Sequence, residues 1–155
     1  MAMNRFSYAA ASTVDEVLEV LGADCRPLSG GVDLLDRLKE GLLAPERLVS
    51  LKQVGELAEV RADEDGLHLG AMVSLAVLEA HPALAALEWT CLRQALRETA
   101  SPQIRHMASL GGNLLQRPRC WYLRNKLTRC LRKGGQRCFR SEEHTSELQS
   151  RENLV

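Results

Sequence analysis

Two glycine pairs are the positions at which this sequence could bind a ligand through its backbone. The first lies in the segment 28–35, Leu-Ser-Gly-Gly-Val-Asp-Leu-Leu, and the second in the segment 109–113, Ser-Leu-Gly-Gly-Asn. Adjacent glycines allow positive φ and leave the backbone open, so several N–H groups can converge on one anion. Two such segments could hold the two phosphates of a dinucleotide. Neither matches a Walker A or G-x-G-x-x-G motif, and a glycine pair is more often only a tight turn.

The second candidate site is a basic stretch, 117–140, that carries three of the five cysteines. It contains nine lysines and arginines and no acidic residue. The thiolates of Cys120, Cys130 and Cys138 could ligate a metal among these cations. A four-iron cluster needs four cysteines, so a fourth ligand would have to come from Cys91 or from farther along the chain. Two alternatives stay open: an arginine-rich surface that contacts a partner subunit, and a nucleic-acid surface with interleaved aromatic side chains.

Apolar periodicity places the first glycine pair between a strand and a helix. A helix is expected at 13–21, begun by a capping box of Ser12 and Asp15. A short strand at 26–28 then leads into the glycines, and leucines at helical spacing predict a second helix that ends at Gly41. The N-terminal N–H groups of this second helix would favour a phosphate.

Further strands are expected after the second helix. One lies near 48–51, and a hairpin is expected from 57–61 and 67–69, separated by Asp65-Gly66. Strands and helices mix without strict alternation of long βα units, so the predicted fold class is α+β rather than a doubly wound sheet.

The second glycine pair is expected to follow helices. Ser74 can cap one helix, which His81-Pro82 would end. Another helix, up to Ser101-Pro102, is predicted by apolar residues at helical spacing: Leu84, Leu87, Cys91, Leu92, Ala95 and Leu96. A turn of helix and then the second glycine loop are expected at 103–113.

Composition excludes some classes of protein and leaves others open. The chain has 155 residues, of which 45% are hydrophobic, and its 20 basic residues balance its 20 acidic residues. It is long enough for one compact domain, and its balanced overall charge neither favours nor excludes a nucleic-acid, membrane or acidic partner. No apolar run approaches the roughly 20 residues of a membrane span, and 1–11 lacks a signal peptide, so a cytoplasmic location is expected.

An ordered set of short motifs resembles the FAD-binding subunits of the xanthine dehydrogenase family over about residues 5–139. The motifs that carry the resemblance occur in the same order as in that family: Phe6 and Tyr8, Ser29-Gly30-Gly31-Val32-Asp33-Leu34, Leu69-Gly70-Ala71, His81-Pro82, Ser101-Pro102-Gln103-Ile104-Arg105 and Ser109-Leu110-Gly111-Gly112-Asn113. Two positions differ, because Val32 stands where the family commonly has threonine and His106 stands where asparagine is usual. Weaker polar contacts are expected there.

The resemblance implies a two-subdomain FAD-binding domain of the type shared by vanillyl-alcohol oxidase and carbon monoxide dehydrogenase flavoproteins. The first subdomain would span 1–55, and residues 56–139 would form the first part of the second subdomain. FAD would be bound noncovalently, with its pyrophosphate held through backbone N–H groups. The residues implied to bind it are Leu28, Ser29, Gly30, Gly31, Val32, Asp33, Leu34, Leu35, Ile104, Ser109, Gly111, Gly112 and Asn113.

The function implied by the resemblance is that of an electron-transfer subunit in a molybdenum hydroxylase. Its partners would be a molybdopterin-binding large subunit and a 2Fe-2S small subunit, and electrons would pass from iron–sulfur clusters to an external acceptor. The cysteine spacing resembles a branch of the family, including aldehyde oxidoreductase and hydroxybenzoyl-CoA reductase subunits, in which an inserted loop carries a 4Fe-4S cluster. The alternatives are a non-catalytic fragment that acts only in subunit contact and a basic nucleic-acid-binding module.

The last residues, 140–155, resemble a translated sequencing adapter. They are polar and continue no helical or strand pattern. The expectation is that this tail is not native and that the chain is truncated before its FAD site is complete. It would then be inactive alone, since the flavin-covering part of the domain would lie downstream.

Overall fold

The computed structural model describes residues 4–141, and the predicted adapter-derived tail lies outside them except for its first two residues. The chain forms two compact units, Met1–Gln116 and Arg117–Val155. Both glycine pairs belong to the first unit, and the basic cysteine stretch belongs to the second. Strands and helices are mixed, in agreement with the expected α+β class.

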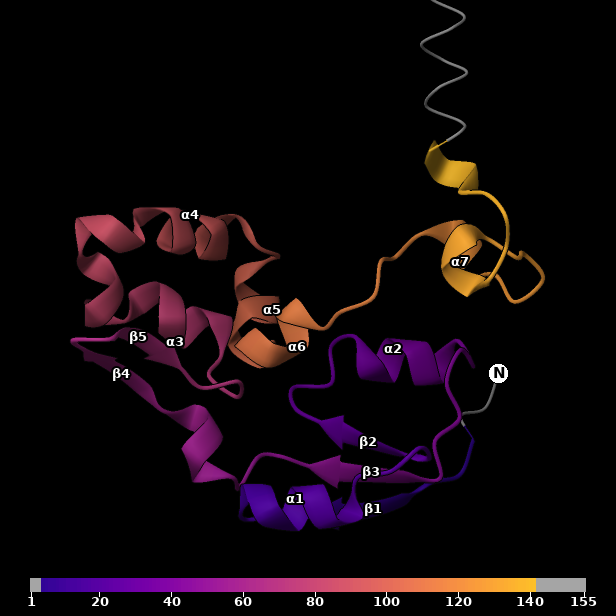
Figure 1. The fold of residues 1–155 in the computed structure, drawn as a ribbon, viewed down its shortest axis with the longest axis horizontal. Helices are drawn as coiled ribbons and strands as arrows, with labels where there is room; N and C mark the ends of the chain where they lie inside the picture. The colour runs from indigo at the N-terminus through magenta and orange to yellow at the C-terminus, as the bar shows by residue number, and fades with distance from the viewer. Residues whose placement is uncertain (1–3, 142–155) are drawn as a thin grey trace, which may run out of the picture. The chain divides into compact units, whose positions relative to one another are not determined.

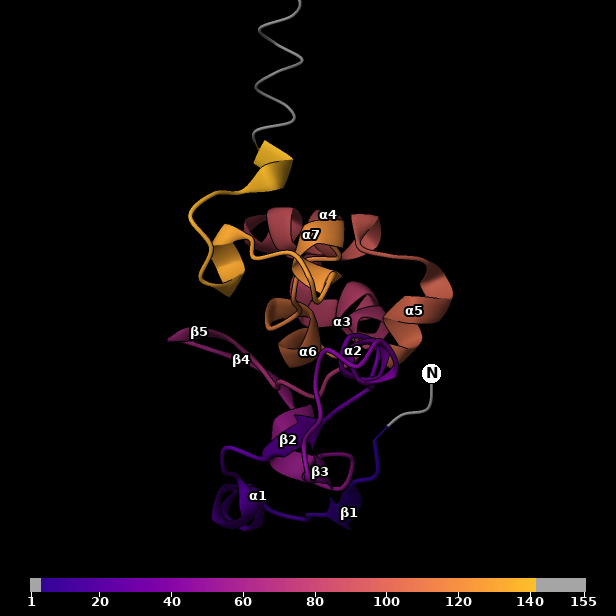
Figure 2. The same ribbon diagram turned by 90° about the vertical axis from the view of Figure 1, so that its right-hand side faces the viewer.

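The first unit begins with a three-stranded parallel sheet in the order β1-β3-β2. The strands are β1 (Ser7–Ala10), β2 (Cys25–Leu28) and β3 (Arg47–Ser50). Parallel strands need crossover connections, and these are supplied by α1 (Val14–Val20) and α2 (Leu34–Lys39). The two helices lie on opposite sides of the sheet (Figures 1 and 2).

Apolar side chains are buried on both faces of the sheet. Val49 of β3 is buried with Val17 of α1 and Cys25 of β2. Leu48 is also buried, and it points to the other face because successive side chains alternate along a strand. Leu38 of α2 is buried as well. The pattern explains why β3, the central strand, is the most apolar of the three.

The rest of the first unit is a hairpin packed with short helices (Figure 1). The hairpin is β4 (Val60–Asp63) and β5 (Gly66–Leu69), and the helices are α3 (Leu75–Ala80), α4 (Thr90–Glu98), α5 (Pro102–Met107) and α6 (Leu110–Leu114). The buried core of this part contains the side chains of Val73, Leu75, Leu78, Leu84 and Leu96.

Several predicted boundaries need correction. The first helix is capped by Thr13 and not by Ser12, because the Thr13 hydroxyl accepts the Glu16 N–H at 3.2 Å. The Glu16 carboxylate accepts the N–H of Ser12, the residue before the cap, at 2.6 Å, so the arrangement is a variant of a capping box, one residue later than expected. The hairpin's first strand starts at Val60, because 55–58 forms a 3₁₀ turn, η1 (Gly55–Ala58).

The single helix expected from Leu84 to Leu96 is wrong. The segment forms two 3₁₀ turns, η2 (Pro82–Ala85) and η3 (Leu87–Trp89), before α4 begins. Ala86 breaks the run with an extended backbone, φ −63° and ψ 148°. Leu84 and Leu96 are buried while Leu87 is exposed, so the apolar spacing does not correspond to one buried helical face.

The second unit contains α7 (Trp121–Arg124) and a 3₁₀ turn, η4 (Leu131–Lys133). The rings of Tyr122 and Phe139 lie 5.4 Å apart between centroids, and the Arg137 guanidinium lies 4.9 Å from the centre of the Phe139 ring. These contacts join the two ends of the segment through aromatic stacking.

Among residues 4–141, no helix is long and apolar enough to cross a membrane.

Candidate functional site

The two glycine segments meet in the first unit. The hydroxyl of Ser29 contacts the hydroxyl of Ser109, 80 residues along the chain. A Cβ on Gly30 would lie 1.7 Å from the carbonyl oxygen of Met107. Real Cβ contacts do not occur at that distance, so Gly30 is the residue that allows the backbones to touch. The structure therefore brings together two segments that the sequence could only suggest as partners.

The first glycine segment presents backbone N–H groups. Gly31 has a φ of 78°, in the left-handed region that glycine tolerates, and its carbonyl accepts the Leu35 N–H at 3.0 Å at the start of α2. Among the residues that the structure describes, no acceptor is found for the N–H groups of Gly31, Val32 and Leu34. These groups precede or begin a helix, where backbone donors characteristically lack partners. They are the donors available to an anion.

The second glycine segment is helical, so the expectation of an open loop is wrong. Gly111 and Gly112 lie in the first turn of α6, and Ser109 caps that turn by accepting the Gly112 N–H at 3.1 Å. The Gly111 N–H donates to the carbonyl of Ala71 at 2.8 Å, and the Asn113 N–H donates to the carbonyl of Ser109 at 2.9 Å. These three N–H groups are thus already used inside the protein.

The contact between the serines leaves one hydroxyl proton for a ligand. Ser29 Oγ accepts the Gly30 N–H at 2.5 Å, and Ser109 Oγ accepts the Gly112 N–H. Each hydroxyl has one proton, and the hydrogen bond between them uses one of the two. Either hydroxyl can donate in this bond. With Ser109 as the donor, the free proton lies on Ser29, which is half-buried whereas Ser109 is only 4% exposed. This corner thus offers an O–H donor in addition to the three N–H groups.

The other predicted binding residues surround this contact to different extents. Leu28 ends β2, and Leu34 and Leu35 begin α2. The Asp33 carboxylate lies 3.6 Å from the Arg37 guanidinium, which makes an i,i+4 pair on the same helix. Ile104 lies on α5 and is partly exposed.

The structure adds two residues at the contact that were not among the predicted binding residues. Met107 contributes the carbonyl against Gly30, and Ala71 contributes the carbonyl that binds Gly111 and lies 3.0 Å from where its Cβ would be. Both act through the backbone, so the identity of their side chains does not reveal the role.

The predicted metal ligands are not gathered. Cys130 is buried, and Cys120 and Cys138 are half-buried. Within residues 4–141, no group of three or more histidine, cysteine or acidic side chains could hold a metal ion. The Cys138 sulfur accepts the Ser141 hydroxyl at 3.2 Å. A 4Fe-4S cluster on Cys120, Cys130 and Cys138 stays a prediction without an assembled ligand set.

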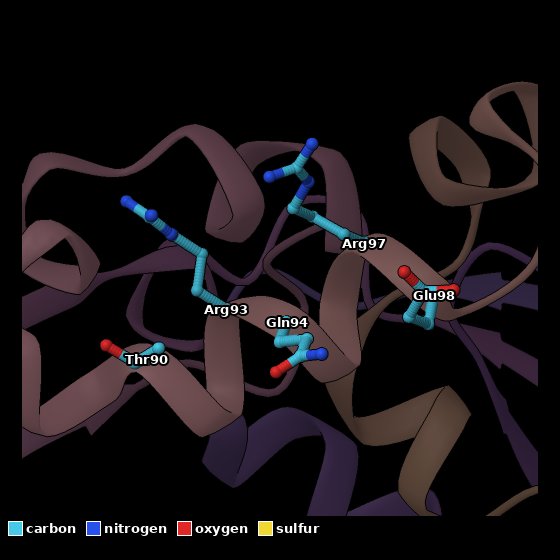
Figure 3. Close-up of a pocket in the computed structure, with 5 residues that line it drawn as sticks. All are labelled: Thr90, Arg93, Gln94, Arg97 and Glu98. Atoms are coloured by element: carbon cyan, nitrogen blue, oxygen red, sulfur yellow. The ribbon is translucent and has the colours of Figure 1, made fainter.

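A hollow of about 350 Å³ lies along α4 and is separate from the glycine segments in the sequence. Its lining comes from one helix: Thr90, Arg93, Gln94, Arg97 and Glu98. Arg93 and Arg97 extend to the same side of the helix (Figure 3). A surface formed by one helix cannot enclose a flavin. The candidate cofactor site is therefore the glycine contact, the place where Ser29 and Gly30 meet Met107 and Ser109.

The family follows from a match over most of the chain. Residues 4–144 match the model of the FAD binding domain in molybdopterin dehydrogenase. The chain belongs to this family. The finding agrees with the resemblance carried by the ordered glycine motifs.

Curated relatives of this FAD binding domain include subunits of several dehydrogenases. The carbon monoxide dehydrogenase medium chain of Afipia carboxidovorans is 38% identical over 63% of this chain and 33% of its own length. The FAD-binding subunit of an Escherichia coli aldehyde oxidoreductase is 36% identical over 77% of this chain and 38% of its own. The chain therefore matches only 33–38% of the length of these relatives.

Solved structures with the same domain agree in fold. Quinoline 2-oxidoreductase from Pseudomonas putida is 33% identical, with a TM-score of 0.69 over 74% of this chain and 40% of that chain. Carbon monoxide dehydrogenase from Hydrogenophaga pseudoflava is 32% identical, with a TM-score of 0.67 over the same shares.

Proposed function

We propose that the glycine contact in the first unit binds the pyrophosphate of FAD and that the chain is the FAD-binding part of a molybdenum hydroxylase. The observation that carries this proposal is the approach of Gly30 to the Met107 carbonyl, beside N–H groups that have no acceptor among the described residues. The site is then formed by the backbone of the two glycine segments, and their close approach depends on the absence of a Cβ at Gly30.

The residues present fit a pyrophosphate. The N–H groups of Gly31, Val32 and Leu34 are donors that a phosphate oxygen can accept, and the Ser29 hydroxyl adds one more. Val32 offers no hydroxyl of its own, so the backbone carries the recognition. FAD, when bound, supplies the redox chemistry, while the chain binds and orients it.

The wider assignment rests on the family membership. We propose that the chain adopts the two-subdomain arrangement of vanillyl-alcohol oxidase and carbon monoxide dehydrogenase flavoproteins, with noncovalent FAD. The partners would be a molybdopterin-binding large subunit and a 2Fe-2S small subunit in the cytoplasm, and electrons would leave FAD for an external acceptor. Relatives named as medium chains or FAD subunits support this proposal.

The proposal is tested by comparing ligands that differ in their phosphates. Purified chain is titrated with FAD while flavin fluorescence is recorded, and ADP and FMN are then used as competitors. A site that recognises a pyrophosphate should release FAD to ADP and bind FMN, which has one phosphate, at least about tenfold more weakly than FAD. Equal binding of FMN and FAD, or no competition by ADP, would contradict a pyrophosphate site.

Gly30→Ala should disrupt the proposed pyrophosphate site. Because the added Cβ would meet a carbonyl oxygen, the segments must separate, which should cost about 1–3 kcal/mol of stability and weaken FAD binding by at least tenfold. Gly22→Ala is the matched control, since a Cβ there meets nothing within 4 Å. Urea unfolding and the FAD titration measure both effects. Equal behaviour of the two variants would contradict the role of Gly30.

A second candidate role, contact with a partner subunit, is favoured by the surface of the second unit. Trp121 is 88% exposed and Leu127 is 93% exposed, and both lie among arginines and lysines. Aromatic side chains and arginines are enriched at protein–protein interfaces. Trp121→Ala should reduce co-purification with the molybdenum and iron–sulfur subunits when the three are expressed together, and unchanged recovery would count against this role.

A further inference from the structure

Arg105, two residues before Met107 in the sequence, is a charged side chain with several hydrogen-bond partners. It lies on α5 and its side chain is 13% exposed. One guanidinium nitrogen, Nη1, lies 3.0, 3.3 and 3.1 Å from the carbonyl oxygens of Arg97, Thr99 and Ala100, which share its two N–H groups. Its Nε lies 3.0 Å from the Glu79 carboxylate. A single side chain thus connects α3, the end of α4 and α5.

The backbone that Arg105 binds is unusual. Ala100 has a φ of 56°, in the left-handed region that non-glycine residues rarely adopt. Such a conformation persists only where surrounding contacts determine it. The three carbonyls held by Arg105 come from this bend and from the last turn of α4, so the guanidinium fixes the path by which the chain enters α5.

The position of α5 determines how closely the two glycine segments approach each other. Met107, two residues after Arg105, provides the carbonyl that lies against Gly30. Ser109, two residues later, provides the hydroxyl that contacts Ser29. A small displacement of α5 would therefore move the second glycine segment away from the first.

We propose that Arg105, paired with Glu79, is a positioning residue for the glycine contact. It acts through α5 and touches no phosphate itself, and it sets the separation of Gly30 from Met107 on which anion binding depends. This inference rests on the proposed function where FAD affinity is concerned, but its structural part does not. Lysine cannot replace it, because an ammonium is a point charge and cannot fork between a carboxylate and three carbonyls.

The matched pair of variants is Arg105→Lys and Arg97→Lys. Both arginines approach Glu79, but Arg97 is exposed and lies 3.9 Å from it, and within residues 4–141 its side chain donates to none of these carbonyls. In the 155-residue chain, Arg105→Lys should weaken FAD binding about tenfold, because α5 and the second glycine segment would no longer be held against the first. It should also speed amide hydrogen exchange in 107–113, while Arg97→Lys should match the wild type in both measurements.

Amide exchange separates the failure of this inference from the failure of the proposed function. If FMN binds as well as FAD, or ADP does not compete, the proposed function is contradicted and exchange in 107–113 alone decides the role of Arg105. Exchange and FAD affinity within twofold of wild type in Arg105→Lys would overturn the inference. If Arg105→Lys does not fold by far-UV circular dichroism, Glu79→Gln takes its place. Faster exchange in 107–113 for Glu79→Gln supports the inference, and unchanged exchange overturns it.

Discussion

Gly30 and Gly31 are neighbours, yet the structure needs glycine at each for a different physical reason. Gly30 must lack a Cβ because the Met107 carbonyl occupies that space. Gly31 must tolerate a φ of 78°, and its Cβ would also lie 2.9 Å from the Leu35 side chain. One residue therefore permits a tertiary contact, and the next permits a turn of the backbone into α2.

Another residue-scale effect concerns a carboxyl in the hairpin. Loss of solvent contact raises the pKa of Asp63, but the His68 hydrogen bond, the Asp65 amide and the charges of His68 and Arg61 outweigh it. The pKa is therefore held below its ordinary value of 3.8. A lowered pKa in the folded state contributes stability above the ordinary value, and this contribution is lost as the pH falls through the lowered value.

His68→Ala should raise the pKa of Asp63 toward its ordinary value. The His68 Nε2 lies 3.1 Å from Asp63 Oδ1, and its removal takes away both a hydrogen bond and a charge. An NMR titration of the Asp63 carboxyl carbon measures the change directly. His106→Ala, an exposed histidine on α5, should leave the curve unaltered. An unshifted titration in His68→Ala would show that His68 does not set the pKa.

At the scale of elements, serine caps organise the second glycine segment and the helices around it. Ser74, Ser101 and Ser109 each accept an N–H from three residues ahead, at the start of α3, α5 and α6. Such caps satisfy donors that a helix leaves unpaired. Ser109 differs from the other two because it is buried and its hydroxyl also contacts Ser29.

Ser109→Ala should cost about 1–3 kcal/mol in the free energy of unfolding, because a cap and a buried hydrogen bond are lost together. Ser101→Ala is the matched control, since it removes an exposed cap with a longer 3.4 Å bond and should cost about 0.5–1 kcal/mol. Urea unfolding followed by circular dichroism measures both. Equal losses in the two variants would show that the contact with Ser29 contributes nothing to stability.

Sequence patterns reveal local features of this fold better than distant ones. The strand before Ser29, the helix after Asp33 and the Ser74 cap follow from apolar spacing and from side chains that bond their own backbone. The helical state of Gly111 was not predictable, because glycine disfavours helices and the turn forms only when Ala71 and Ser109 supply acceptors. Tertiary hydrogen bonds here override local preference.

At the candidate site, too, local sequence features were predictable and contacts between distant residues were not. The two glycine pairs were recognisable from their order among other motifs, but their direct contact involves the carbonyl of Met107, which any residue type could provide. The role of Arg105 was equally hidden, because its acceptors are backbone carbonyls. A backbone carbonyl that accepts a hydrogen bond leaves no signature in the side chain of the residue that provides it.

For the molecule as a whole, the division into two units predicts where a protease cuts the chain. The second unit begins at Arg117, and residues 116–120 form no helix or strand. Segments of this kind are preferred sites of proteolysis. The compact unit Met1–Gln116 contains both glycine pairs, so FAD binding should belong to it.

Brief trypsin treatment should therefore cut after Arg119 and leave a fragment of residues 1–119. The Arg117-Pro118 bond resists trypsin because proline follows the arginine. Mass spectrometry identifies the fragment, and gel filtration with FAD shows whether flavin stays with it. Cleavage that starts inside the first unit would instead show that this unit is less compact than the structure indicates.

The strand order of the first sheet has a consequence for biosynthesis. β3 lies between β1 and β2 in space but follows both of them along the chain. On the ribosome, the two edge strands are thus made before the strand with which each of them pairs, and Val17 and Cys25 emerge before Val49 can cover them. Unpaired strand edges and uncovered apolar residues attract other chains. The nascent protein is most vulnerable to aggregation until residue 50 has left the exit tunnel, and a chaperone that acts at that stage should raise its yield more than one that acts after release.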